Sequence, residues 1–120
     1  MRMNILQHDH PRGRHWDLLV EQPDAAMLAT WALDGPPVES RPIPARRLPD
    51  HRPLYLDYEG PVSGDRGHVS RWDHGTCRIV ERGEESWTVE LHGEQTIGTA
   101  VLRRLPDGDW EFLLTTSPAG

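Results

Sequence analysis

Short apolar or alternating runs make up most of this chain, and glycine, proline or an acidic residue follows most of them. In an extended strand, residues two positions apart point to the same face, so such alternation is typical of a half-buried strand. Runs separated by turn residues at intervals of about ten favour strands joined by tight turns. The pattern predicts strands at 3–7, 15–21, 26–33, 68–72, 76–81, 86–92, 96–104 and 110–115.

The segments between the runs predict how the strands are connected. Turn residues at 73–75 separate the strand at 68–72 from the one at 76–81, and a turn at 105–109 joins the last two strands into a hairpin. Residues 117–120 read as a frayed tail. We therefore predict a mainly β fold, a small antiparallel β-barrel with short helical or loop insertions, forming a single domain over residues 1–120.

Composition narrows the class of protein. The 120 residues are enough for one domain, and 36% hydrophobic with 27% charged residues is typical of a globular protein. The net charge of −6 argues against broad nucleic-acid binding, so any contact with DNA should be local. The lone Cys77 excludes an internal disulfide. No apolar run approaches the ~20 residues of a membrane span, so we expect no membrane association and a cytoplasmic location.

One segment, 39–52, is locally basic in this acidic chain and reads as a loop. It is either solvated or turned towards a phosphate. The following 61–67 stretch is glycine-rich but lacks the lysine of a nucleotide-binding loop, so it reads as a turn. The arginines of the basic segment are Arg41, Arg46, Arg47 and Arg52.

The stretch from 8 to 21 carries the candidate chemistry. His15 and Asp17 lie two residues apart, so they share a face of the second predicted strand, and a tight loop containing Pro11 and Gly13 returns towards His8. Two imidazoles and one carboxylate form a ligand set suited to Mn, Zn or Fe. The competing interpretation is a solvated polar loop.

Four motifs in order along the chain resemble the 3′-phosphoesterase domain found at the N-terminal end of bacterial DNA ligase D. Any one of them is weak, but together they span residues 4–115 in register. They are His8-Asp9 leading to His15-Trp16-Asp17-Leu18, Trp31-Ala32 followed by Gly35-Pro36, Asp50-His51 through Tyr55 to Asp57-Tyr58-Glu59-Gly60, and Trp72-Asp73 with Gly75-Thr76.

The resemblance implies a β-barrel enzyme that depends on Mn²⁺, or on Zn²⁺ or another divalent metal, and acts on DNA 3′ ends. The implied substrate is a primer-template with a terminal ribonucleotide or 3′-phosphate, in end-joining repair beside a ligase or Ku. Carried over by position, His8, His15 and Asp17 match the metal ligands. His51 and Tyr55 match the residues that contact the reacting phosphate.

The chain departs from the family pattern at three polar positions. Leu19 stands where the family has a phosphate-binding arginine, Asp34 where it has a lysine, and Leu6 where it has a glutamine. The loop between His8 and His15 is also one residue longer. Losing a charge-assisted hydrogen bond costs about 1.5–3 kcal/mol, so replacement contacts are needed for useful catalysis. The candidates are Arg12, Arg14, Arg46, Arg47 and Arg52.

Three hypotheses follow from these residues. The first is a metal-dependent phosphoesterase that processes DNA 3′ ends, and the second is a catalytically weak or inactive relative that binds DNA 3′ ends or a repair partner. The third is an iron oxygenase with a two-histidine, one-carboxylate site. In that case His68, His74 or His92 would supply the distal imidazole.

Overall fold

The computed structural model describes residues 1–38 and 41–116, and almost all of its regular structure is antiparallel sheet. The expected tail at 117–120 and the first two residues of the basic segment lie outside the described residues. The elements are β1 (Arg2–His10), β2 (Gly13–Gln22), β3 (Ala25–Leu33), β4 (Ile43–His51), the 3₁₀ helix η1 (Pro53–Leu56), β5 (Gly60–Pro61), β6 (His68–Arg82), β7 (Ser86–Gly93), β8 (Ile97–Arg104) and β9 (Trp110–Thr115).

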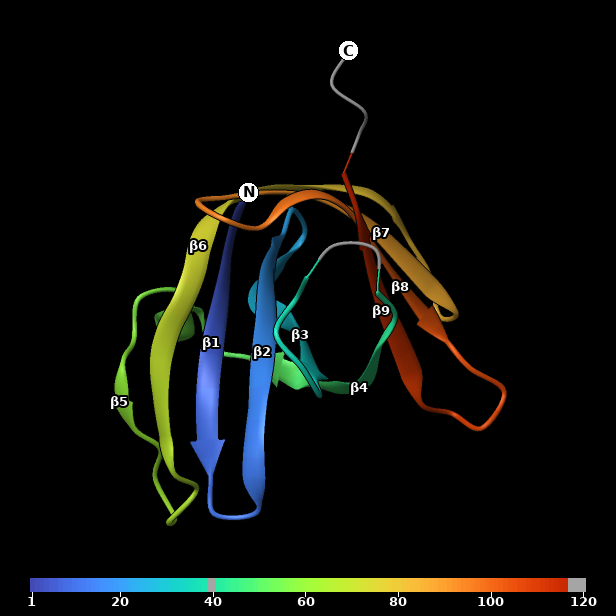
Figure 1. The fold of residues 1–120 in the computed structure, drawn as a ribbon. Helices are drawn as coiled ribbons and strands as arrows, with labels where there is room; N and C mark the ends of the chain where they lie inside the picture. Colours follow the sequence, from blue (N-terminus) through green and yellow to red (C-terminus); the bar gives the residue numbers. More distant parts are fainter. Residues whose placement is uncertain (39–40, 117–120) are drawn as a thin grey trace.

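All nine strands belong to one sheet in the order β1-β2-β3-β4-β9-β8-β7-β6-β5, and β1 also pairs with β6. This last pairing brings the sheet back onto its first strand and gives a ring-like arrangement, with β1 between β2 and β6 and with β7, β8 and β9 on the opposite side (Figure 1). The prediction of a mainly β, antiparallel fold is confirmed, and η1 is the short helical insertion.

Two apolar clusters lie on opposite faces of the sheet. In β2, Leu18 faces inward and its neighbour Leu19 faces outward, as the alternation of a strand requires, and both are fully buried. The inner cluster fills the ring around Trp31, whose ring packs edge-on against Trp87 at 5.0 Å between centroids. The outer cluster lies beneath η1 and consists of Leu6, Leu19, Leu28, Leu56 and Val69, with Tyr55, Tyr58 and Val62 packed against it.

The two strands predicted at 68–72 and 76–81 are wrong as separate elements, because β6 runs unbroken through the expected turn at 73–75. The pairing between β1 and β6 shifts register at Trp72, just before this stretch, which marks an irregularity in the strand rather than its end. Gly75 allows close contact between strands, since a Cβ there would lie 2.1 Å from the carbonyl oxygen of His92. The carboxylate of Asp73 accepts hydrogen bonds from the backbone of the β7–β8 turn.

The basic segment was also wrongly expected to be a loop, because most of it forms β4. This strand joins the two halves of the ring through β3 and β9. Ile43 and Ala45 are buried on its inner side, whereas Arg46 is exposed on the other side. The prolines and arginines of this strand hid the alternation of its two buried apolar residues, Ile43 and Ala45. No helix among the described residues is long and apolar enough to cross a membrane.

Candidate metal centre

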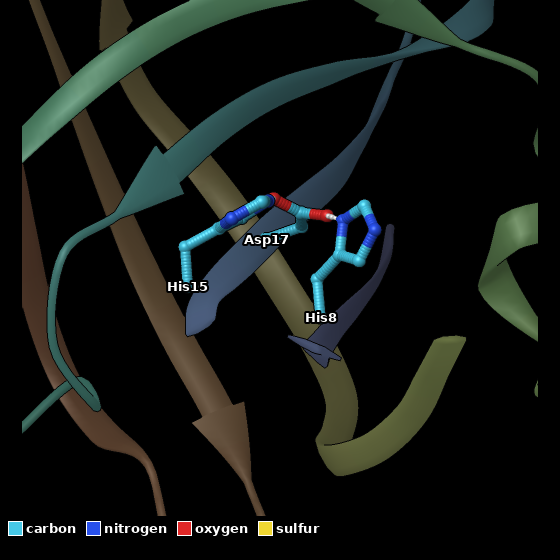
Figure 2. A group of neighbouring side chains, drawn as sticks. All are labelled: His8, His15 and Asp17. Atoms are coloured by element: carbon cyan, nitrogen blue, oxygen red, sulfur yellow. Dashed lines mark hydrogen bonds and ion pairs between the residues drawn. The ribbon is translucent and has the colours of Figure 1, made fainter. Parts of the chain in front are cut away.

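The hairpin of β1 and β2 places three polar side chains together on the outer face of the sheet. His8 lies directly opposite His15 in the register of the two strands, and Asp17 is two residues further along β2 on the same face. Figure 2 shows the two imidazoles on either side of the Asp17 carboxylate. The hairpin register thus delivers the grouping that the sequence predicts.

The donor atoms of these residues are close enough to share one cation. One ligand atom from each residue lies within 4.8 Å of the others. Nδ1 of His8 is 3.3 Å from Oδ2 of Asp17, and Nε2 of His15 is 3.1 Å from Oδ1 of the same carboxylate. The Asp17 side chain is 6% exposed, and the imidazoles of His8 and His15 are 12% and 16% exposed. The group is therefore largely shielded from water but reachable from one side.

The tautomer of His8 shows why this group suits a metal. Its Nε2 is 2.6 Å from the carbonyl oxygen of Arg66, which only accepts, so Nε2 carries the proton. In neutral His8 the Nδ1 lone pair then faces the lone pairs of the Asp17 carboxylate. Two acceptors at this distance require a proton or a cation between them. A histidine held by a backbone carbonyl through its other nitrogen is the usual arrangement of a metal-binding imidazole.

The pKa values of His8 and Asp17 reflect the same close pairing. Hydrogen bonding to Asp17 raises the pKa of His8 above its usual 6.5. Burial raises the pKa of Asp17, but the imidazoles of His15 and His8 outweigh burial and hold that pKa below its usual value. Although Nε2 of His15 lies 3.1 Å from Oδ1 of Asp17, no hydrogen bond of good geometry reaches this buried oxygen. The residues fit a divalent cation, with two nitrogen donors and a carboxylate, of the class that includes Mn²⁺ and Zn²⁺.

A cavity of about 550 Å³ opens beside the three candidate ligands. Its wall combines the outer face of the β1–β2 hairpin with β4 and the loop before β6, so segments far apart in the sequence meet there. The volume is in the range of small-molecule sites. The lining residues are His8, His10, Arg12, Gly13, Arg14, His15, Asp17, Asp34, Arg46, Leu48, Pro49, His51 and Arg66.

The structure places the two predicted phosphate-contacting residues differently. His51 lines the cavity, and its Nδ1 is 2.8 Å from the carbonyl oxygen of Pro49. That bond places a proton on Nδ1 and leaves Nε2 as the ring nitrogen available to a substrate. Tyr55 is not among the lining residues, and its ring lies edge-on to His51 with 5.6 Å between centroids. Tyr55 therefore supports His51 from the side of η1.

The predicted arginines divide into two groups. Arg12, Arg14 and Arg46 line the cavity, whereas Arg47 and Arg52 do not. Arg47 points into the ring instead, where its guanidinium carbon lies 4.3 Å from the centroid of Trp31 and 5.2 Å from that of Trp87.

Arg66 is a cavity residue that the sequence interpretation missed, because the 61–67 stretch reads only as a turn. The signal that could have found it is a lone arginine in a glycine-rich loop two residues before a strand. With it, four arginines line the cavity, against the two acidic residues Asp17 and Asp34. An acidic protein thus concentrates positive charge beside its candidate metal ligands, which favours an anionic substrate.

The departures from the family pattern have a structural explanation at two positions. Leu6 and Leu19 are both buried to within 1% and belong to the outer apolar cluster beneath η1. Neither leucine lines the cavity. Both are packed in the outer cluster, so the replacement of glutamine and arginine by leucine leaves no gap in the structure. At the third position Asp34 is exposed at the cavity, where a lysine was expected.

The iron-oxygenase hypothesis relied on a distal imidazole, and the structure supplies a different one. Among the residues that the structure describes, only His8, His15 and Asp17 bring three such donor atoms together. His68 and His92 are not in this group, and His74 pairs with Glu94 at 2.6 Å. No observation of this structure therefore favours that hypothesis.

Comparison with known proteins agrees with the motifs and the site. No curated protein matches the chain. The family model described as the DNA ligase D 3′-phosphoesterase domain matches residues 6–104 of the 120, a range that includes all the candidate ligands and the residues of the cavity wall. The chain therefore belongs to the DNA ligase D 3′-phosphoesterase domain family.

Proposed function

We propose that this protein is a metal-dependent phosphoesterase that processes DNA 3′ ends by removing a terminal ribonucleotide or a 3′-phosphate. The observation that carries the proposal is the facing pair of acceptors, Nδ1 of His8 and Oδ2 of Asp17, beside a positively charged cavity. Family membership supplies the substrate class, since the domain is a phosphoesterase of a DNA ligase. In this proposal the product is a clean 3′-hydroxyl, which an end-joining ligase, with Ku at the break, would then use.

In the proposed site, His8, His15 and Asp17 hold the cation. We propose Mn²⁺, with Zn²⁺ or another divalent metal as the alternative. When bound, such an ion polarises a phosphoryl oxygen and lowers the pKa of a water molecule. The carbonyl of Arg66 holds the proton on Nε2 of His8, so Nδ1, which faces the Asp17 carboxylate, is the nitrogen that would bind the cation.

His51 is the proposed acid of the reaction. Its Nδ1–H is held by the Pro49 carbonyl, so in the imidazolium form, with both ring nitrogens protonated, Nε2–H gives its proton to the departing 3′ oxygen as the bond between phosphorus and that oxygen breaks, and His51 is left neutral. Water contributes the oxygen that replaces the 3′ oxygen on phosphorus, so the products are a 3′-hydroxyl and either inorganic phosphate, from a 3′-phosphate end, or a ribonucleoside 5′-phosphate, from a ribonucleotide end. Tyr55 packs edge-on against His51 and acts as a positioning residue. Phosphoryl transfer relies mainly on positioning and charge stabilisation, which a small site can supply.

The proposal is tested with a primer-template that ends in a ribonucleotide or a 3′-phosphate. The wild-type protein, stripped with chelator and reloaded with MnCl₂, should release the ribonucleotide or phosphate, and His15→Ala should abolish release. His92→Ala is the matched control, because His92 is exposed and lies outside the group of candidate ligands. Release that persists in His15→Ala would overturn the metal assignment.

A second candidate function is binding of DNA 3′ ends, or of a repair partner, without turnover. The specific observation in its favour is the burial of Leu19 and Leu6 where the family has polar residues. Tight binding of 3′-phosphate ends with no product released, whichever divalent metal is added, would establish it over the enzyme.

A further inference from the structure

The loop between β5 and β6 is seated directly on the end of β1. The N–H of Val62 donates to the carbonyl of Gly67 at 2.8 Å, which closes the loop. Gly67 has a φ of +87°, and a Cβ there would lie 1.9 Å from the carbonyl oxygen of Asp9. Only glycine permits this approach. The result is that Arg66 is held against the strand that carries His8.

Arg66 contacts the candidate metal centre through its backbone and is also one of the residues of the cavity wall. Its carbonyl oxygen accepts from Nε2 of His8 at 2.6 Å. Arg66 lines the same cavity as His15 and His51. One residue therefore links the orientation of a candidate ligand to the charge of the substrate cavity.

The Arg66 guanidinium is oriented but not neutralised. Its Nε donates to the carbonyl of Ser63 at 2.7 Å, and one terminal nitrogen is 3.3 Å from the Ser63 hydroxyl. Within the described residues no carboxylate lies at ion-pair distance from it. Its remaining N–H groups have no partner in the part of the chain that the structure describes. A fixed guanidinium with spare donors is suited to bidentate phosphate binding.

The other three arginines of the cavity are less suited to this role. Arg14 is already paired, since its Nε is 2.6 Å from the carboxylate of Asp9. The side chains of Arg12 and Arg46 make no hydrogen bond within the part of the chain that is described, so nothing fixes their position. Ordering a free arginine side chain on binding costs conformational entropy. This cost is smaller for Arg66, because Ser63 already holds its side chain.

We infer that Arg66 binds the terminal phosphate of a DNA 3′ end and replaces the arginine that the family carries where Leu19 stands here. The inference rests on the proposed function for the identity of the phosphate. In this chain the positive charge lies in the loop before β6, at Arg66. The corresponding position on β2 is Leu19, which belongs to the outer apolar cluster.

The test measures binding in the absence of metal, where protein side chains alone distinguish a phosphate from a hydroxyl. Two fluorescent primer-templates, one ending in a 3′-phosphate and one in a 3′-hydroxyl, are titrated in EDTA with wild type, Arg66→Gln, Arg66→Lys and Arg103→Gln. Arg103 is the control, because it is exposed on β8, lies 3.7 Å from Glu111 and is outside the cavity. Unfolding temperatures are recorded for each variant.

The expected result is that wild type and Arg103→Gln prefer the 3′-phosphate end, and that Arg66→Gln binds this end about 10- to 100-fold more weakly while its affinity for the 3′-hydroxyl end changes little. Arg66→Lys should fall between the two, because it keeps the charge but loses the planar fork and the Nε bond to Ser63.

The inference is overturned if Arg66→Gln keeps the wild-type preference, or if wild type shows none. The proposed function is tested separately, by measuring manganese-dependent product release by wild type. If no product is released, the proposed function fails. A protein that releases no product yet loses its phosphate preference in Arg66→Gln would remove the enzyme proposal and leave the Arg66 inference standing.

Discussion

His8 and Asp17 face each other across the β1–β2 hairpin with 3.3 Å between Nδ1 and Oδ2, while the other ring nitrogen of His8 is committed to the carbonyl of Arg66. The pair is incomplete without a proton or a cation. Because a proton fills the gap when metal is absent, the pKa of His8 is raised. The first prediction concerns what a cation does in its place.

A divalent metal that binds only the folded protein should raise its thermal stability. At a free concentration of 100 times the Kd, the stabilisation is about 2.7 kcal/mol, which corresponds to a rise of several degrees in Tm. We expect MnCl₂ to raise the Tm of wild type but not that of Asp17→Asn, measured by calorimetry. Asp57→Asn is the control, since Asp57 is exposed and pairs with Arg2. An equal rise in Asp17→Asn would contradict the ligand assignment.

Asp73 should make stability depend on acid pH. Burial raises the pKa of this carboxyl, but hydrogen bonds from Thr96, Glu94 and His74 outweigh burial and lower it below its usual 3.8. The stabilisation is therefore complete above about pH 4 and is lost as pH falls through the lower pKa of the folded state.

The measurement is urea unfolding of wild type and Asp73→Asn at pH 7 and at pH 3. At pH 7 the variant should be less stable by at least about 2 kcal/mol, because both carboxylate oxygens accept backbone N–H bonds, whereas an amide has one acceptor oxygen and would turn its NH2 towards two of these N–H groups. The difference should shrink at pH 3. A difference that stays constant with pH would show that Asp73 acts by shape and not by charge.

Restoring the family arginine in β2 should damage this protein. Leu19 is fully buried in the outer apolar cluster, so Leu19→Arg places an unpaired charge there at a cost of about 3–5 kcal/mol. Leu19→Met keeps the volume and should cost less than about 1.5 kcal/mol. Chemical denaturation compares the two. If Leu19→Arg were as stable as wild type and bound 3′-phosphate ends more tightly, the outer apolar cluster would not prevent an arginine at this position from binding phosphate.

Gly67 should matter for metal binding although its side chain is only a hydrogen. Gly67→Ala forces the loop away from Asp9 and moves the Arg66 carbonyl from His8, so Mn²⁺ affinity should fall about 10- to 100-fold. Gly64→Ala is a close control: φ there is +75°, but a Cβ would meet only a side-chain atom at 3.8 Å. Titration calorimetry on both variants separates the contact from ordinary backbone strain. Equal losses in the two would assign the effect to strain alone.

The sequence predicted the parts of this molecule that depend on local pattern. Alternation located the strands, and a hairpin with His8, His15 and Asp17 at matching positions was sufficient to bring the three together. It could not predict that the Asp-His-Gly stretch at 73–75 would continue through β6, because the same residues form turns and irregular strands. The sequence also could not predict that the outward-facing Leu19 is buried, because that face of β2 is apolar only where η1 packs onto it.

The position of Arg66 depended on long-range contact. Its loop reads as an ordinary turn, and its importance arises from pairing between β1 and β6, where Asp9 lies opposite His68. No periodicity within either strand reports that neighbour. Arg47 illustrates the reverse case, because a basic residue in a basic segment turned inward onto Trp31.

The pairing of β1 with β6 has a consequence for how the protein acquires its site. It joins the first residues of the chain to residues beyond its midpoint, so it belongs to the slow, non-local class of folding contacts. The hairpin can bring its imidazoles and carboxylate together early, but the carbonyl that selects the ligating tautomer arrives only when the sheet closes. A nascent or partly unfolded chain would therefore hold its ion loosely, and full affinity would report that folding is complete.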